Sequence, residues 1–165
     1  MNYHYLPIYV LSAALGGSYY LGYIPPIIFF IFAIASMLTY FIYAKDKQAA
    51  KNDQWRISES TLHLYSLLFG WPGAIVAQQK LRHKSKKQSF RTVFMFTVII
   101  NVALIAALHT NDGSQILRSS TNKLGNFITV NVGNQQINSV ITFLLKFRKD
   151  NILYKESATF YIRES

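Results

Sequence analysis

The sequence contains no cysteine, and no Asp, Glu, Lys or Arg occurs before Lys45. The absence of cysteine excludes disulfide bonds, thiolate nucleophiles and metal sites built from thiolates. The chain also lacks the HExxH, GxSxG and phosphate-loop motifs that mark common enzyme classes. We therefore expect no cofactor and no metal, and the sequence favours a non-catalytic role over an enzymatic one.

Charge is missing from a second long stretch, Thr92–Leu108, although the chain of 165 residues carries a net charge of +10. A soluble domain of this size rarely contains such uncharged runs, whereas a protein embedded in a bilayer requires them. The basic excess lies outside both runs, and beside membrane spans it favours anionic lipid over nucleic acid. The sequence therefore predicts an all-α integral membrane protein.

Three stretches are predicted to be membrane-spanning helices, at residues 5–24, 27–44 and 85–108. At the rise of an α-helix, ~20 residues cover the ~30 Å of a hydrocarbon core. Pro25 and Pro26 predict a tight turn between the first two helices, which makes them an antiparallel hairpin. Residues 1–109 are thus expected to form a multi-pass membrane domain.

A further apolar segment, residues 62–81, is interrupted at 70–73 by Gly-Trp-Pro-Gly. Each half would be only ~12 Å long as a helix. Two geometries compete: a proline-kinked helix that crosses the bilayer, or a re-entrant or interfacial hairpin that enters and leaves on one side. The flanking loops, 45–60 and 80–91, are both rich in Lys and Arg. The positive-inside rule therefore favours the re-entrant geometry, because it keeps both loops in the cytoplasm.

The basic cluster after the broken segment is the strongest candidate site. Cations beside a membrane attract anionic lipid headgroups, and an acidic partner would meet the same charges. A purely topogenic role for this cluster stays open. The residues proposed to bind headgroups or a partner are Lys80, Arg82, His83, Lys84, Lys86, Lys87 and Arg91.

A second set of residues is expected to be structural, namely Trp55, Arg56, Glu59, His63, Gly70, Trp71, Pro72, Gly73 and Asn101. Trp55 is a plausible anchor at the interface, and Asn101, in the middle of the last span, is expected to hydrogen-bond another helix. Glu59 and His63 lie four residues apart, so they share one helical face and also suggest a general-base pair of a membrane enzyme.

Two other functional classes stay open beside the membrane enzyme. The broken helix at Gly70–Gly73 resembles the interrupted helices of transporters, so a small homo-oligomeric transporter is one alternative. A nucleic-acid-associated membrane protein is another, but Phe90 is the only aromatic side chain near the cations that would stack on bases.

The tail, residues 110–165, changes in character and is expected to be an extension of uncertain order. Ile128, Val130 and Val132 alternate with polar residues, which predicts a strand followed by a turn at Gly133-Asn134. Residues 140–147 and 158–163 are candidates for further strands. A small β-containing appendage is therefore one expectation for this part of the chain.

Several short motifs occur together between Ser36 and Leu108. They are Tyr-Ala-Lys-Asp-Lys at 43–47, Trp-Arg-Ile-Ser-Glu at 55–59, Leu-His-Leu at 62–64, Gly-Trp-Pro-Gly at 70–73, Ala-Gln at 77–78, Arg-His-Lys at 82–84 with Lys87, Ser-Phe-Arg at 89–91, and Asn101. In these motifs the chain resembles the bacterial membrane family called domain of unknown function 1294.

The resemblance implies a small multi-pass protein of the bacterial inner membrane, of unknown activity. Some family members carry an N-terminal cold-shock domain that binds nucleic acid, whereas this chain begins with a predicted span. The combined expectation is a non-catalytic membrane scaffold or anchor whose basic cytoplasmic face contacts anionic headgroups or an acidic partner.

Overall fold

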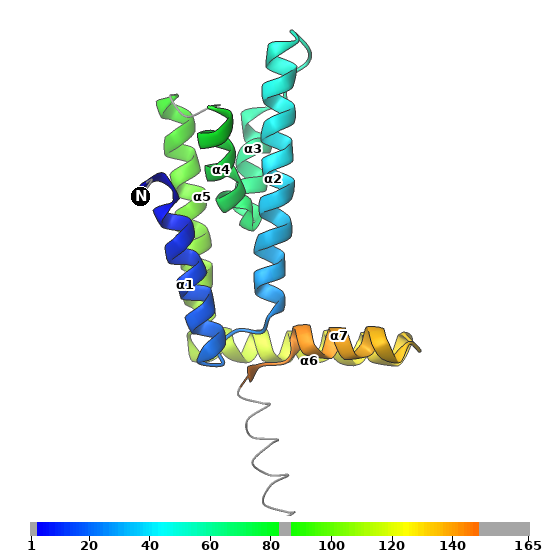
Figure 1. Ribbon diagram of the computed structural model, residues 1–165. Coiled ribbons are helices and arrows are strands. Elements are labelled where there is room, and N and C mark those ends of the chain that lie inside the picture. The colour runs from blue at the N-terminus through cyan, green and yellow to red at the C-terminus, as the bar shows by residue number, and fades with distance from the viewer. Residues whose placement is uncertain (1–2, 83–86, 149–165) are drawn as a thin grey trace, which may run out of the picture. The chain divides into compact units, whose positions relative to one another are not determined.

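The structure is a computed structural model that describes residues 3–82 and 87–148, and in these residues it contains helices and no strand. The elements are η1 (Tyr3–Tyr5), α1 (Leu6–Tyr20), α2 (Ile27–Lys51), α3 (Glu59–Tyr65), η2 (Ser66–Gly70), α4 (Trp71–Leu81), α5 (Gln88–Ala107), α6 (Asn111–Asn131) and α7 (Gln135–Leu145) (Figure 1). The prediction of an all-α protein is confirmed for this part of the chain. The helices form two compact units, which combine the described residues of 1–12 with 29–105, and of 13–28 with 106–148.

Within the residues that the structure describes, two helices are long and apolar enough to cross a membrane. The most apolar 18-residue windows of α2 and α5 have mean hydropathies of 2.3 and 2.0. Three spanning helices were predicted, and this number is wrong for the described residues because α1 has only 15 residues. At helical rise α1 covers ~22 Å, which is less than a ~30 Å hydrocarbon core. α1 ends where the chain turns at Gly22, whose φ of 77° suits glycine.

The helix predicted at 27–44 continues without a break to Lys51. The added segment, residues 45–51, is rich in Ala, Lys and Gln, which favour helix. It also extends the buried face of α2, since Asp46 and Ala49 follow Thr39 and Tyr43 at helical spacing. The first part of the loop expected at 45–60 is therefore the last part of α2.

The broken segment folds as two short helices joined by a π-helical turn. Ser58 caps α3 by accepting a hydrogen bond from the Thr61 amide. The helical geometry is lost at Leu68 and Phe69, where Phe69 has a φ of 66°. The break was predicted at 70–73, but Gly70 ends η2, and Trp71, Pro72 and Gly73 begin α4. Pro72 is compatible with this position because the first helical turn needs no amide donor there.

This α3–η2–α4 segment, which we call the hairpin, lies between α2 and α5 (Figure 1). Glycine permits its close approach to α2, because a Cβ at Gly70 would overlap Thr39 and a Cβ at Gly73 would overlap the Ser36 backbone. On the other side, Asn101 of α5 donates a 2.9 Å hydrogen bond to the Leu67 carbonyl in η2. The expected interhelical role of Asn101 agrees with this contact.

The second unit corrects the prediction of a β-containing extension. Residues 128–131 belong to α6, Val132 is the C-cap of that helix, and residues 140–145 belong to α7. The alternation at 128–132 lies at the end of a long helix. Thr110 caps the start of this helix by accepting a hydrogen bond from the Gly113 amide. The predicted turn at Gly133-Asn134 joins the two helices, and Asn134 caps α7. The candidate strand at 158–163 lies outside the described residues.

Candidate functional site at the polar end of the hairpin

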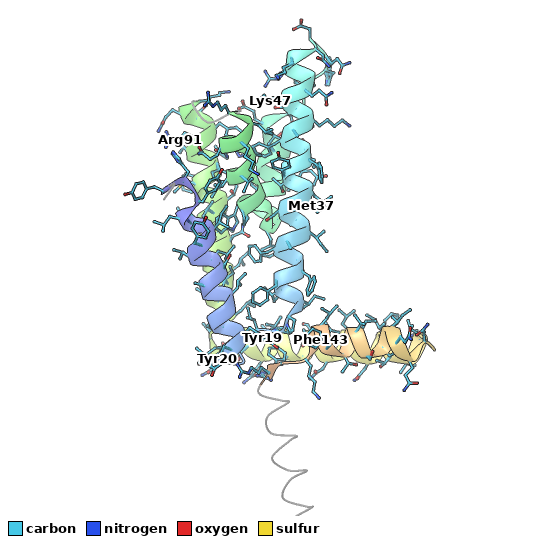
Figure 2. The ribbon with its side chains drawn as sticks, in the orientation of Figure 1. Tyr19, Tyr20, Met37, Lys47, Arg91 and Phe143 are labelled. Atoms are coloured by element: carbon cyan, nitrogen blue, oxygen red, sulfur yellow. The ribbon has the colours of Figure 1, made fainter. Side chains whose placement is uncertain are left out.

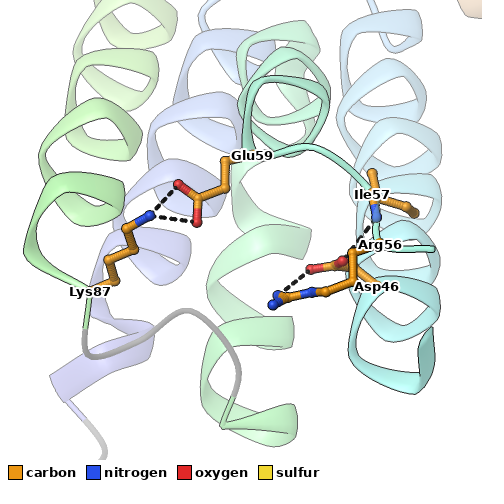
Figure 3. Close-up of polar contacts among 5 residues, drawn as sticks. All are labelled: Asp46, Arg56, Ile57, Glu59 and Lys87. Atoms are coloured by element: carbon orange, nitrogen blue, oxygen red, sulfur yellow. Dashed lines mark hydrogen bonds and ion pairs between the residues drawn. The ribbon is translucent and has the colours of Figure 1, made fainter. Parts of the chain in front are cut away.

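Asp46 is the centre of a polar cluster at the end of the hairpin (Figure 3). Its side chain is fully buried, and it follows the apolar segment of α2 in the sequence. One carboxylate oxygen accepts a 3.1 Å hydrogen bond from the Ile57 amide, and the other lies 3.6 Å from Nη2 of Arg56. A buried carboxylate requires such partners, so Asp46 fixes the connector that precedes α3.

Lys47, the next residue, makes the corresponding contact with the other end of the hairpin. Its Nζ donates a short hydrogen bond to the carbonyl of Leu81, the last residue of α4. The connector before α3 and the end of α4 therefore both contact the same turn of α2. This arrangement requires the chain to reverse within residues 59–81, as Figure 1 shows for α3 and α4.

A second ion pair joins the hairpin to α5. Both carboxylate oxygens of Glu59 lie within 3.0 Å of Lys87 Nζ, just before α5 begins (Figure 3). One helical turn further along α3, His63 packs on Phe90 with 4.2 Å between the ring centroids. Glu59 thus contacts Lys87, just before α5, and His63 contacts Phe90 of α5.

The connector before the hairpin presents a different kind of side chain. Trp55 is 97% exposed in its connector, although a tryptophan ring is a large apolar surface. Trp71, in contrast, is buried at the start of α4. The two tryptophans therefore occupy opposite environments, and only Trp55 is available to an external apolar medium.

The basic cluster is only partly inside the described residues. Lys80, Arg82, Lys87 and Arg91 are exposed side chains, and Figure 2 shows Arg91 at the same end of its unit as Lys47. Arg82 ends α4 in the left-handed conformation, with φ of 48° and ψ of 43°. His83, Lys84 and Lys86 of the predicted site lie outside the described residues.

The cations differ in whether an acid already neutralises them. Within the described part of the chain, Lys87 is paired with Glu59 and Arg56 with Asp46. Lys80, Arg82 and Arg91 have no carboxylate within salt-bridge distance in that part. Within the described part of the basic cluster, those three side chains have charge to offer an external anion.

A buried polar stripe on α2 was missed by the sequence interpretation. Thr39 bonds the Tyr65 carbonyl, and the Tyr43 hydroxyl lies 3.5 Å from Ser66 Oγ. Thr39, Tyr43 and Asp46 are separated by four and then by three positions, which is the spacing of one helical face. The signal was present, because polar side chains at helical spacing in an apolar run predict a face that packs on protein.

The site has no arrangement of acids that suggests metal chemistry. Among the residues 3–82 and 87–148, no group of three His, Cys, Asp or Glu side chains lies together as a metal site requires. What the described geometry offers is a polar end with two internal ion pairs and exposed cations that include Lys80, Arg82 and Arg91.

Comparison with known proteins gives two matches, and the family model falls within the first unit. Residues 36–90 match the model of a family described as "Protein of unknown function (DUF1294)". Uncharacterized protein YsdA of Bacillus subtilis (strain 168) is 31% identical over 77 residues, which cover 47% of this chain and 86% of that protein. No solved structure matches the chain. The family match includes α3, η2, α4 and both ion pairs of the polar end.

Proposed function

The chain belongs to the DUF1294 family, and on that premise we propose that it is a membrane-embedded anchor whose basic cytoplasmic end binds anionic lipid headgroups. The observation that carries the proposal is the exposure of its two most apolar helices. Only 17% of the apolar window of α2 and 22% of that of α5 are buried. The core helix of a soluble protein would be mostly buried, so these faces favour contact with lipid.

Individual side chains illustrate that exposure. Met37 and Phe41 of α2 are 62% and 59% exposed, and Figure 2 shows Met37 on the side of α2 away from the hairpin. On α5, Phe96 and Ile99 are 60% and 57% exposed. Each such side chain costs about 1.5–3 kcal/mol to hold in water rather than in an apolar medium. A bilayer removes this cost from both helices at once.

The direction of insertion follows from the connectors. The connector before the hairpin contacts Asp46, and the last residue of the hairpin contacts Lys47, at one end of the unit. The sequence contains ten Lys or Arg residues from Lys45 to Arg91, whereas the connector at residues 21–26 carries none. The positive-inside rule therefore favours a cytoplasmic polar end. In this orientation the hairpin is re-entrant, because it enters and leaves from the cytoplasmic leaflet.

Lys80, Arg82 and Arg91 are the proposed headgroup ligands. Each exposed cation near an anionic leaflet contributes ~1 kcal/mol, so three contribute ~3 kcal/mol, or roughly a 150-fold enrichment of anionic lipid. The arginines add geometry, because a planar guanidinium binds a phosphate through two hydrogen bonds. Lys87 contributes less in this proposal, since Glu59 already neutralises it.

The orientation is tested by labelling single cysteines, which is straightforward because the chain has none of its own. We expect Gln54→Cys and Gln88→Cys to react with an impermeant maleimide from the same face of sealed vesicles. Thr110→Cys, beyond α5, is the control and should react only from the other face. Labelling of Gln54→Cys and Gln88→Cys from opposite faces would refute the re-entrant orientation.

Headgroup binding is tested by native mass spectrometry of the full chain with phosphatidylglycerol and phosphatidylcholine. The variant Arg82→Gln/Arg91→Gln removes ~2 kcal/mol and should lower the preference for phosphatidylglycerol about thirtyfold. The matched control, Asn52→Ala/Gln54→Ala, changes two exposed neutral residues of the same polar end and should leave the preference intact. Equal binding of the two lipids by the unmodified chain would refute the proposal.

A further inference from the structure

The second unit contains an amphipathic pair of helices whose apolar side chains point outward. On α6, Ile116, Leu124 and Phe127 are 66%, 46% and 68% exposed, and they recur at helical spacing. On α7, Ile137 and Val140 are 48% and 56% exposed and also share one face. Apolar faces of this kind call for a covering medium or partner.

The apolar faces of the two helices lie on the same side of the pair. Polar residues of both helices line one shallow hollow, including Asn122 and Thr129 of α6 and Thr142 of α7. The helices pack through Gly125, whose Cα faces the side chain of Leu145. Because the polar positions of both helices meet on one side, the apolar positions opposite them form a continuous surface on the other side.

This pair is anchored to the end of α1. Arg118 donates to the Gly22 carbonyl at 3.2 Å and stacks on Phe147 at 4.1 Å from the ring centre. Arg148 stacks on Tyr20 at 3.9 Å and donates to its carbonyl at 3.4 Å. Each guanidinium thereby keeps a cation beside an aromatic ring, which is the composition of a membrane–water interface.

Tyrosines mark the end of α1 to which the pair is joined. Tyr20 and Tyr23 are 67% and 40% exposed, and Tyr23 packs on His109, which also lies 2.8 Å from Ser18 Oγ. Figure 2 shows Tyr19 and Tyr20 at this end of the helix. α1 itself carries no charge over its whole length. An uncharged helix that ends in tyrosines places their rings at the level of the lipid headgroups.

We propose that α6 and α7 form an interfacial element, with their shared apolar face in the outer part of the acyl region and their polar hollow toward water. The inference rests on the proposed membrane location of the chain. The covering medium is a phospholipid surface, because the pair is joined to the end of α1 at which Tyr20 and Tyr23 are exposed. Charge agrees with this occupant, since residues 111–148 carry four Lys or Arg and Asp112 as their single acid.

The depth of spin labels in the full chain, reconstituted in phospholipid nanodiscs, tests the element. We expect labels at Leu124→Cys and Phe127→Cys to collide with oxygen several-fold more, relative to a water-soluble nickel chelate, than a label at Asn122→Cys. Asn122 is the matched control, because it lies on the same helix within the polar hollow. A label at Ile99→Cys in α5 reports separately on the membrane span.

The outcomes separate the two proposals. Oxygen-rich surroundings at Ile99→Cys, with water at all three positions of α6, would overturn the interfacial element and leave the membrane anchor standing. Water at Ile99→Cys would overturn the anchor itself. Labels at Leu124→Cys and Phe127→Cys that neither reagent reaches would show a protein contact, such as a second copy of the chain, and would overturn the assignment of lipid as the covering medium.

Discussion

Replacement of Gly73 by alanine tests whether the hairpin depends on close contact with α2. A Cβ on residue 73 would lie 2.7 Å from Ser36 Cα and still closer to the carbonyl of Ser36. These are backbone atoms, so no side-chain rotation relieves the overlap, and α4 has to move away from α2. The movement would also displace Leu81 from Lys47, and with it the geometry of the polar end.

The expected cost follows from overpacking. Insertion of a methyl group into a packed interior costs about 1–3 kcal/mol, and backbone contact favours the upper half of that range. For a chain of this size, each 1 kcal/mol lowers the midpoint of thermal unfolding by about 2–4 °C. We therefore expect Gly73→Ala to lower the midpoint by roughly 4–12 °C in detergent, followed by far-ultraviolet circular dichroism.

Gly17→Ala is the matched control for this prediction. Gly17 also lies in a helix, but no atom lies within 4 Å of a Cβ built there. Because alanine favours helix over glycine by about 1 kcal/mol, this variant should unfold at the same temperature or slightly higher. An unchanged midpoint for Gly73→Ala, or an equal loss for Gly17→Ala, would refute the role of the close helix contact.

Three further substitutions have expected costs that differ with burial. Asp46→Ala leaves the Ile57 amide without its acceptor in a buried site and should lower the free energy of unfolding by about 1.5–3 kcal/mol. Arg56→Gln removes the half-exposed partner of Asp46 and should lower it by under about 1 kcal/mol. Equal losses for the two variants in chemical denaturation would contradict this order. Asn101→Ala removes the hydrogen bond to η2 and should lower stability by about 0.6–1.7 kcal/mol, so an unchanged midpoint in detergent would show that this bond is not formed. Lys87→Gln breaks an exposed pair with Glu59 and should cost under about 1 kcal/mol, with the difference from the unmodified chain shrinking as salt rises; a difference independent of salt would argue against the ion pair.

Several features were predictable because they depend on local sequence. The uncharged runs predicted the two most apolar helices, and the Gly-Trp-Pro-Gly motif predicted a break in the segment at 62–81 within two residues of its observed place. The motifs also predicted the family. Each of these features depends on properties of a short stretch of sequence, such as its hydropathy or the missing amide donor of Pro72.

In the helical tail, the prediction of a strand from a short stretch of sequence was wrong. The alternation at 128–132 satisfies a strand pattern over five residues, but a longer window includes Ile116, Leu117 and Leu124 at helical spacing. The caps at Thr110 and Asn134 complete the signal for two helices. Propensity over a short window is a weak guide when the element is longer than the window.

By itself the sequence determined where the chain is apolar, where its cations gather and where its helix must break. Only the tertiary structure decided that the broken segment reverses, that Asp46 is buried with the Ile57 amide, and that Lys47 reaches the far end of the same hairpin. The physical reason is that these contacts join residues 11 and 34 positions apart. Their free energy depends on the packing of α2 against both arms of the hairpin, which no local pattern of side chains contains.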